Sequence, residues 1–376
     1  MTVSPERRRF LVLTPSIDGA DGLSALSRQV VRALAVDPGR VEVWALDGGR
    51  VRDTFEPVRV RLAGGRRSTF LGWTLSGAAR PLHDVTVVVM HAHLAPLASI
   101  LALRGARTAL FLVGVEVWRR LSPAERFAFD RADCVIAISD HTAGRFRAAN
   151  PALRERSISV CRPGVGPAPP LARPQGRRGF ALIVGRMWSE ERYKGHDWLI
   201  DVWPAIRERV PNATLIVAGD GDDRPRLESR VAANGLTAAI QFTGLVNDDQ
   251  LAGLYRASAF FVMPSTGEGF GLTYLEAMRA GKPCIAVHGA SNEIIDHGID
   301  GVIVEAGQTD RLVEAIVGLF TDADWRERLG AAAAARVTRE FTEEAFGTRF
   351  RAALGLSTST AGGAASPDMT QVRRAV

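Results

Sequence analysis

The chain has few cysteines and no long apolar run. Among its 376 residues only Cys134, Cys161 and Cys284 are cysteines, and they lack the spacing of a metal site. We therefore expect reduced thiols in the core of a cytoplasmic protein. The most apolar region, residues 85–117, is interrupted by histidine, proline and arginine, so no membrane span is expected there. Residues 1–9 are polar, and no signal peptide is expected.

Lysine is almost missing, and the charge is unevenly distributed. Lys194 and Lys282 are the only lysines among 47 basic residues. Residues 1–172 hold 24 arginines and 15 acidic residues, a net charge of +9, whereas residues 173–376 carry a net charge of −3. This asymmetry predicts an anionic partner for the first half, with an arginine-rich solvated surface as the alternative of equal weight.

Residues 64–83 interleave arginine with large apolar side chains. Arg66, Arg67 and Arg80 alternate with Phe70, Leu71 and Trp73 in this segment. Such a mixture is typical of segments that lie on an anionic membrane surface. A partly buried loop and helix would show the same pattern, and both interpretations are kept.

Short β-like runs alternate with helical patterns along the chain, which predicts an α/β protein with two doubly wound parallel sheets. We place the first domain at residues 1–172 and the second at 173–340. A helix at 341–356 is predicted to return to the first domain, and residues 357–376 are predicted to be a disordered tail. The proline-rich residues 163–178 are the predicted linker. Ligands favour domain interfaces, so we expect a cleft between the domains.

Residues 264–278 are the most informative segment. They connect an apolar β-like run to a helix, predicted at 275–280, through a loop with three glycines. In a βαβ unit, such loop amides and the helix N-terminus favour an anion. Glu268 and Glu276 flank this loop eight residues apart. Because a carboxylate repels phosphate, we interpret both as acceptors for hydroxyl groups of a ligand.

Two cations precede this loop at the ends of predicted elements. Arg186 follows a β-like run, and Lys194 precedes a predicted helix. Both can reach the same sheet edge as the glycine-rich loop, and two cations suit a diphosphate. The ligand that fits is a nucleoside diphosphate sugar, with ribose at Glu276, diphosphate at Arg186 and Lys194, and sugar at Glu268.

Residues 180–340 resemble the second half of GT-B glycosyltransferases of family 4, which are retaining and metal-independent. The matching motifs are Gly185-Arg186, Lys194-Gly195, Gly219-Asp220-Gly221, Phe242-Thr243-Gly244, Pro264-Ser265, Glu268-Gly269-Phe270-Gly271, Glu276-Ala277-Met278 and Gly281-Lys282-Pro283. The spacing of the two glutamates is the most specific of these features. The first half resembles the family only in its architecture and in a few short matching segments.

The resemblance implies roles for named residues. Arg186 and Lys194 would stabilise the leaving diphosphate, Glu276 would bind the ribose, and Glu268 would contact the donor sugar or the positive charge at its anomeric carbon. The further donor-binding residues that it implies are Gly19, Gly22, Gly219, Leu245, Gly269, Phe270, Gly271 and Leu272. A tight turn is the alternative explanation for Gly19 and Gly22.

The implied reaction is transfer of a sugar, with retention, from a nucleotide sugar to a glycan or lipid-linked acceptor. No cofactor, no metal and no nucleic-acid partner are expected, and we interpret Asp220 and Asp222 as turn residues rather than metal ligands. The predicted location is cytoplasmic. Peripheral binding to an anionic inner membrane surface is a further hypothesis.

The chain departs from the family at Val113, where many relatives have a histidine. We expect His93 or Glu116 to supply the missing polar group, or the group to be absent. Two alternatives therefore stay open: a non-catalytic nucleotide-binding subunit, and a related GT-B nucleotide-sugar epimerase or phosphorylase. A phosphorylase needs a lysine for pyridoxal phosphate, and Lys282 before Pro283 is a poor candidate.

Overall fold

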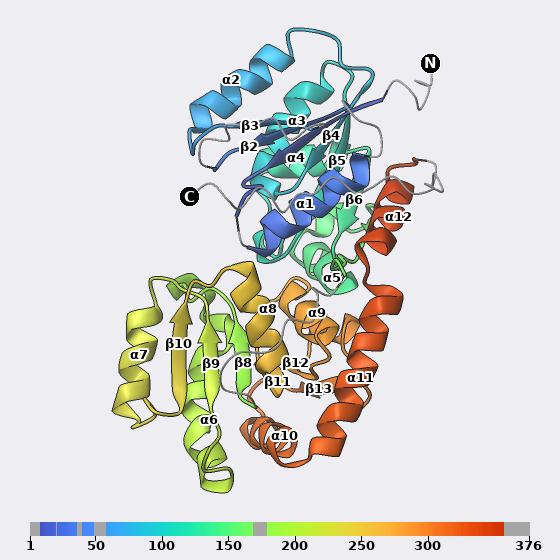
Figure 1. The fold of residues 1–376 in the computed structure, drawn as a ribbon. Helices are drawn as coiled ribbons and strands as arrows, with labels where there is room; N and C mark the ends of the chain where they lie inside the picture. Colours follow the sequence, from blue (N-terminus) through green and yellow to red (C-terminus); the bar gives the residue numbers. More distant parts are fainter. Residues whose placement is uncertain (1–7, 20, 36–39, 49–57, 168–178, 357–376) are drawn as a thin grey trace. The chain divides into compact units, whose positions relative to one another are not determined.

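The computed structural model describes residues 8–19, 21–35, 40–48, 58–167 and 179–356. The chain divides into two compact units, the first made of Met1–Pro163 and Glu343–Val376 and the second of Gly164–Thr342. Each unit has its own parallel sheet with helices, as predicted (Figure 1). The predicted boundary at 172/173, most of the predicted linker and the predicted tail lie outside the described residues.

The first unit contains a seven-stranded sheet in the order β3-β2-β1-β4-β5-β6-β7. Its strands are β1 (Arg9–Thr14), β2 (Val41–Ala45), β3 (Arg59–Leu62), β4 (Val85–Val89), β5 (Arg107–Leu112), β6 (Cys134–Ala137) and β7 (Ser159–Val160). Its α-helices are α1 (Gly22–Leu34), α2 (Arg67–Gly77), α3 (Ala95–Ala102), α4 (Pro123–Arg131), α5 (Asp140–Ala149) and α12 (Glu343–Ala353). Helix α12 packs against α1, so the end of the described chain returns to this unit.

The second unit contains a six-stranded sheet in the order β10-β9-β8-β11-β12-β13. Its strands are β8 (Ala181–Val184), β9 (Leu215–Ala218), β10 (Ile240–Gly244), β11 (Phe260–Met263), β12 (Cys284–Val287) and β13 (Gly301–Val304). Its α-helices are α6 (His196–Arg209), α7 (Arg224–Ala233), α8 (Asp248–Ala257), α9 (Leu272–Arg279), α10 (Thr309–Thr321) and α11 (Ala323–Glu340), and the 3₁₀ helix η5 (Ser189–Lys194) precedes α6.

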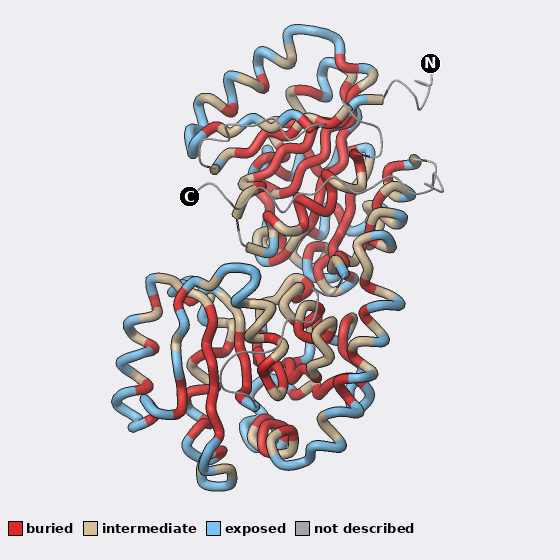
Figure 2. Tube along the Cα trace, viewed as in Figure 1, coloured by how far each residue is buried: buried red, intermediate tan, exposed pale blue. Residues whose placement is uncertain are grey.

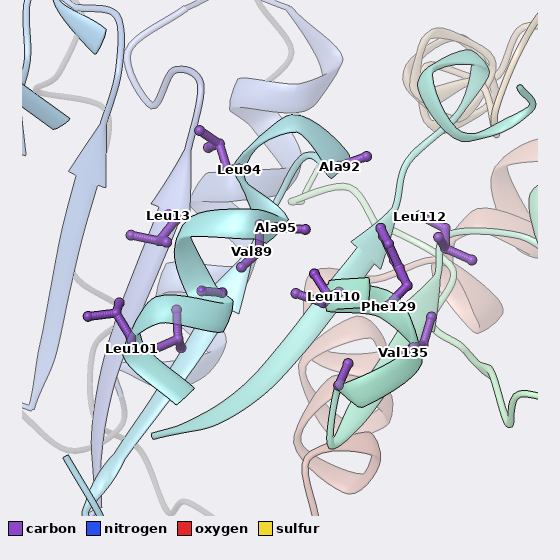
Figure 3. Close-up of a cluster of buried hydrophobic side chains, with 14 of the residues drawn as sticks. Leu13, Val89, Ala92, Leu94, Ala95, Leu101, Leu110, Leu112, Phe129 and Val135 are labelled. Atoms are coloured by element: carbon purple, nitrogen blue, oxygen red, sulfur yellow. The ribbon is translucent and has the colours of Figure 1, made fainter. Parts of the chain in front are cut away.

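The central strands are mostly apolar, as expected where helices cover both faces of a parallel sheet. All five residues of β4 and all four of β11 are buried. Figure 2 shows the central strands of both units buried and the outer sides of the helices exposed. One apolar cluster of the first unit joins β1, β4 and β5 to α3 and α4, through side chains such as Leu13, Val89 and Phe129 (Figure 3).

Some elements differ from the sequence-based expectations. Helix α9 begins at Leu272, three residues before the predicted start, because Gly271 has a left-handed conformation that caps the helix. Helix α2 occupies Arg67–Gly77 of the segment at 64–83, with Phe70 and Thr74 buried, which agrees with a partly buried loop and helix. The membrane-surface interpretation of this segment stays a prediction. Strand β7 and helix α8 were not predicted.

Candidate active site

The loops after β8 and β11 lie side by side because of the strand order. Strand β8 pairs with β11, yet the chain leaves β8 toward β9 on one side and leaves β11 toward β12 on the other. In open parallel sheets, ligands bind at the carboxyl ends of strands where the order reverses in this way. The loops that carry Arg186, Lys194 and Glu268 therefore lie at the expected ligand-binding edge of the second unit.

Glycines allow the two loops to touch through their backbones. Gly195 has a φ of +88°, and a Cβ there would lie 2.6 Å from the carbonyl oxygen of Pro264. A Cβ on Gly267 would lie 2.5 Å from the ring of Tyr193. The amide of Thr266 donates to the carbonyl of Tyr193 at 2.9 Å. Larger residues at either glycine would push the loops apart, so the glycines determine how close the functional side chains lie.

Lys194 and Glu268 form a direct ion pair across these loops. The Lys194 Nζ donates to Oε1 of Glu268 at 3.0 Å, and the two side chains are only 14% and 18% exposed. Ser265 donates its hydroxyl to the same oxygen at 3.4 Å. Lys194 and Glu268, which are 74 positions apart in the sequence, therefore lie in direct contact. The predicted phosphate-binding and sugar-binding groups are thus neighbours. A ligand phosphate at Lys194 would lie next to the Glu268 carboxylate.

Arg186 is the more exposed of the two predicted cations, with 48% of its side chain accessible. Its guanidinium pairs with Oε1 of Glu191 and lies 5.2 Å from the ring centre of Trp188. The other carboxylate oxygen of Glu191 is buried and has no hydrogen-bond partner among the described residues. Neither Glu191 nor Trp188 was predicted, since their relation to Arg186 depends on the path of η5.

The predicted glycine at 219 has a packing function in the structure. Gly219 has a φ of +134°, and a Cβ there would lie 2.0 Å from the carbonyl oxygen of Gly185. The loop after β9 can therefore approach the loop that carries Arg186. Leu245, the predicted donor-binding residue after β10, is 81% exposed. Asp222 accepts hydrogen bonds from the backbone and hydroxyl of Ser189, in a turn as interpreted from the sequence.

Gly271 starts helix α9 and thereby sets the position of Glu276. Its φ is +109°, and a Cβ would lie 2.4 Å from the ring of Tyr274. Phe270 beside it is 2% exposed, and its ring centre lies 6.1 Å from that of Phe341. Phe270 thus fixes the loop from its buried side, while Gly269 and Leu272 are half-buried next to it.

Glu276 is held by a tyrosine that the sequence analysis missed. The Tyr255 hydroxyl donates to Oε2 of Glu276 at 2.9 Å, and Tyr255 itself is buried. Oε1 of Glu276 forms no hydrogen bond within the described part of the chain, so it can accept one from a ligand. Burial raises the pKa of Glu276 above its ordinary value, and the bond from Tyr255 opposes this rise. Because Tyr255 precedes Glu276 by 21 residues, on α8, no sequence spacing indicated the pair.

The first unit has an equivalent reversal of strand order between β1 and β4. The predicted Gly19 follows β1, and the predicted Gly22 begins α1 after the helix cap Asp21. The buried Arg28 donates to the carbonyls of Ile17 and Gly19, at 2.7 and 2.9 Å, and so holds this loop. The loop is closely packed, since a Cβ on Gly19 would lie 2.5 Å from Asp21.

His93 follows β4 and is oriented by a buried carboxylate. Its Nδ1 lies 3.0 Å from Oε1 of Glu125, whose side chain is only 4% exposed, while His93 itself is 66% exposed. Burial would raise the pKa of Glu125, but hydrogen bonds from Arg119 and Ser122 outweigh it and lower the pKa to about 2. Glu125 therefore stays charged next to His93. Burial lowers the pKa of the neighbouring His91 to about 4.

Glu116 binds its own loop. Its Oε1 accepts hydrogen bonds from the amides of Val113 and Gly114, at 2.8 and 3.0 Å. Burial raises the pKa of this carboxyl, and the two amide bonds act in the opposite direction. Its contacts stabilise the turn after β5, and that turn is where the family histidine was expected.

The described residues offer neither a metal cluster nor a membrane-spanning helix. They contain no group of three or more histidine, cysteine or acidic side chains that could hold a metal ion. None of the described helices is both long enough and apolar enough to cross a membrane. The three cysteines are unpaired thiols, and Cys134 is half-buried rather than fully buried like the other two.

Comparison with known proteins identifies relatives of this chain. The family model for "Glycosyl transferases group 1" matches residues 179–322. A GDP-mannose-dependent alpha-(1-6)-phosphatidylinositol monomannoside mannosyltransferase of Mycobacterium tuberculosis is 31% identical over 286 residues, covering 69% of this chain and 73% of that protein. The lipopolysaccharide core mannosyltransferase LpsB of Rhizobium meliloti is 32% identical over 242 residues, covering 60% of this chain and 66% of that protein.

Solved structures share the fold at lower identity. The Anabaena protein HepE, in complex with UDP and glucose, gives a TM-score of 0.76 at 19% identity and covers 93% of this chain and 100% of its own. Sucrose-phosphate synthase from Thermosynechococcus elongatus gives a TM-score of 0.75 at 20% identity, covering 93% of this chain and 98% of its own. Both are similar over both units of the present structure.

Proposed function

The chain belongs to the group 1 glycosyl transferases, and from that premise we propose that its second unit binds a nucleoside diphosphate sugar between the loops of Lys194 and Glu268. The sugar is transferred, with retention, to a glycan or lipid-linked acceptor. The observation that carries this proposal is the 3.0 Å contact between these two side chains at the switch point of the sheet. Among the predicted charged site residues that the structure describes, this is the one pair that forms an ion pair.

The site can supply the electrostatic part of the reaction. As the bond from the anomeric carbon to the diphosphate breaks, negative charge develops on the phosphate oxygens, where Lys194 and Arg186 would stabilise it. Positive charge develops on the sugar, next to Glu268. The acceptor hydroxyl adds to the same face of the sugar and gives its proton to the departing phosphate. The enzyme then acts by positioning and charge, and we propose that it needs no metal or cofactor.

Both cations are paired with carboxylates, and this has a consequence for binding. Lys194 contacts Glu268 and Arg186 contacts Glu191. A diphosphate must share or replace these partners, because carboxylate and phosphate repel each other. Glu268 can remain near Lys194 by accepting a sugar hydroxyl, which satisfies its charge without competing for the phosphate.

The transferase is favoured over the two alternatives left open by the sequence. The relatives are mannosyltransferases, which supports an enzyme rather than a nucleotide-binding subunit or an epimerase. For the donor, we propose GDP-mannose as the first candidate, since one relative is GDP-mannose-dependent and the other is a mannosyltransferase.

The acceptor is the less defined substrate. The arginine-rich first unit supports a proposal that the acceptor is anionic or linked to a lipid phosphate, and that the protein lies on the inner membrane surface. Sedimentation with vesicles tests this idea. Equal binding to neutral vesicles and to vesicles with anionic lipid would contradict it.

The donor assignment is tested by titration with UDP-, GDP- and dTDP-sugars, followed by thermal shift and calorimetry. We expect one nucleotide class to raise the melting temperature in the wild type and to do so much less in Lys194→Ala and Glu276→Ala. Lys282→Ala is the matched control, because Lys282 is the only other lysine. It precedes β12 and so lies at the amino-terminal ends of the strands, away from the proposed site. Unchanged donor binding in both site variants would reject the assignment.

A further inference from the structure

A cavity lies in the first unit, near the amino-terminal ends of its strands and thus opposite the carboxyl ends described above. It has a volume of about 360 Å³, within the range of small-molecule sites. Its lining comes mainly from the amino-terminal halves of β1 to β4 and from α2. The lining residues that carry the argument are Trp44, Arg59, Arg61, Trp73, Arg80 and Leu101.

The strand register explains why arginines line the cavity. Glu42 pairs with Arg59 and Trp44 pairs with Arg61, so these four side chains share one face of the sheet. Helix α2 covers this face at Trp44, whose ring centre lies 6.0 Å from that of Trp73. The chain thus places two exposed arginines of β3 on the same face of the sheet that α2 covers at Trp44.

The close approach of α2 shapes the apolar wall. A Cβ on Gly77 would lie 3.3 Å from the Trp44 ring and 3.5 Å from Leu101, so this glycine lets the helix pack tightly there. Trp44 and Leu101 are buried, and Trp73 is half-buried. The cavity therefore has an apolar wall of aromatic and aliphatic side chains beneath a rim of guanidinium groups.

The rim of the cavity has more guanidinium groups than carboxylates that could pair with them. The lining has five arginines and one carboxylate. Arg61 pairs with that carboxylate, Glu42, at 2.9 Å, and Arg9 pairs with Asp84. Within the described part of the chain, Arg59 and Arg80 form neither an ion pair nor a side-chain hydrogen bond. Guanidinium groups without acidic partners are suited to phosphate oxygens, which they bind through paired N–H donors.

We propose that this cavity binds a phosphate ester that carries an apolar or aromatic group, at a site separate from the donor site. The guanidinium groups of Arg59, Arg61 and Arg80 bind the phosphate, and Trp73 and Leu101 contact the apolar part. Inorganic phosphate alone would leave the apolar wall without a partner. The ester is either a phospholipid or a soluble aromatic phosphate, which present the same chemistry to the cavity.

The alternative explanation is protection of a sheet edge. Strand β3 is at the edge of its sheet, and charged residues on edge strands prevent pairing with other chains. In that case Arg59 and Arg61 need no ligand. Their removal would then favour aggregation without changing the affinity for any phosphate ester.

The test is calorimetric titration of the full chain with three probes: inorganic phosphate, phenyl phosphate, and dihexanoyl phosphatidic acid below its micelle concentration. We expect at least one ester to bind more tightly than inorganic phosphate. The Arg59→Ala/Arg61→Ala variant should weaken that ester about tenfold or more, as expected for the loss of charge-assisted bonds. Arg126→Ala/Arg154→Ala, which removes two exposed arginines elsewhere in the first unit, is the charge-matched control.

A second variant tests the same cavity in case the Arg59→Ala/Arg61→Ala substitutions disturb the folding of β3. Ser76 is exposed on α2 and lines the cavity, so Ser76→Glu adds a carboxylate there without altering β3. It should weaken the same ester. Binding of the lipid ester alone identifies a lipid source, and binding of phenyl phosphate alone identifies a soluble one. If neither ester binds better than inorganic phosphate, or if the control loses as much affinity, the proposal is wrong.

The titration also separates this proposal from the donor assignment. Nucleotide-sugar affinity depends on loops of the second unit, so Arg59→Ala/Arg61→Ala should retain it. Lys194→Ala should retain ester binding while losing donor binding. Loss of both ligands in either variant would contradict the independence of the two sites.

Discussion

Polar side chains at the strand ends of the two units differ in what they contact. In the second unit, contacts cross between segments that follow different strands: Lys194 reaches Glu268, and Tyr255 of α8 reaches Glu276 of α9. In the first unit, Glu116 binds amides of its own loop, and the amide of Gly19 donates to the nearby Ser16. The contrast has exceptions: in the first unit His93 pairs with Glu125 and Asp140 pairs with Arg162, and in the second unit Arg186 pairs with Glu191 of its own loop.

This difference indicates that the second unit is the one that holds its charged groups in fixed positions. Contacts between loops hold charged groups at fixed separations, which a ligand of constant shape such as a nucleotide sugar requires. Contacts within one loop stabilise that loop and leave its outer surface to vary. The comparison predicts that variants in the second unit affect donor binding and that variants in the first unit affect turnover with the acceptor.

The largest expected effect is that of Lys194→Ala. Removing a cation that stabilises the leaving diphosphate should lower kcat about 100- to 1000-fold. Steady-state kinetics with donor and acceptor measures this loss. Lys282→Ala should stay close to the wild type, and equal losses in both variants would mean that Lys194 has no special role.

Glu276→Gln should act on donor affinity. The amide keeps the size of the side chain but loses the charge that strengthens a hydrogen bond from ribose, so the Kd of the donor should rise about 10- to 100-fold. Glu314→Gln, at an exposed carboxylate on α10, is the control for the loss of one charge. A donor Kd within error of the wild type would remove Glu276 from the site.

His93→Ala tests the first unit. We expect kcat to fall about tenfold, as for loss of a positioned polar group, with the donor Kd unchanged. Glu125→Gln should give part of the same loss, because it weakens the orientation of the imidazole. If His93→Ala instead weakens donor binding as much as Glu276→Gln does, the contrast between the two units fails.

The smallest expected effect is that of Tyr255→Phe, and it depends on pH. Burial raises the pKa of Glu276, and the Tyr255 hydroxyl opposes this rise, so the variant raises the pKa further. Because the donor needs the charged carboxylate, affinity declines as pH falls through this pKa, and it should decline at higher pH in the variant. At neutral pH the Kd should rise only a few-fold, about the value of one hydrogen bond. Calorimetry from about pH 8 to about pH 5 measures this shift; superimposable profiles would contradict it.

Much of the fold could be predicted from the sequence because its signals are local. The apolar run at 284–287 predicts a strand and matches β12 in full. The helical patterns at 197–209 and 224–234 match α6 and α7 to within one residue. The alternation of such runs with helical patterns indicates parallel sheets. The two-residue β7 could not be predicted, since it is defined by pairing with β6 rather than by its own pattern.

The proposed donor residues were identified from their spacing and charge, whereas their partners in the structure were not. Arg186, Lys194, Glu268 and Glu276 stand in recognisable motifs next to strands. Tyr255 and Glu191 have no such signal, because they meet these residues only through the packing of α8 and the path of η5.

The sequence by itself determined the fold class, the glycine-rich loop and the chemical types that surround it. Only the tertiary structure decided that Lys194 and Glu268 touch, that Glu116 is bound to its own loop, and that Arg59 and Arg61 line a cavity with Trp44. The physical reason is that periodicity and propensity act over a few residues. Contacts between loops and between neighbouring strands depend on strand order and register, which arise when the whole sheet assembles.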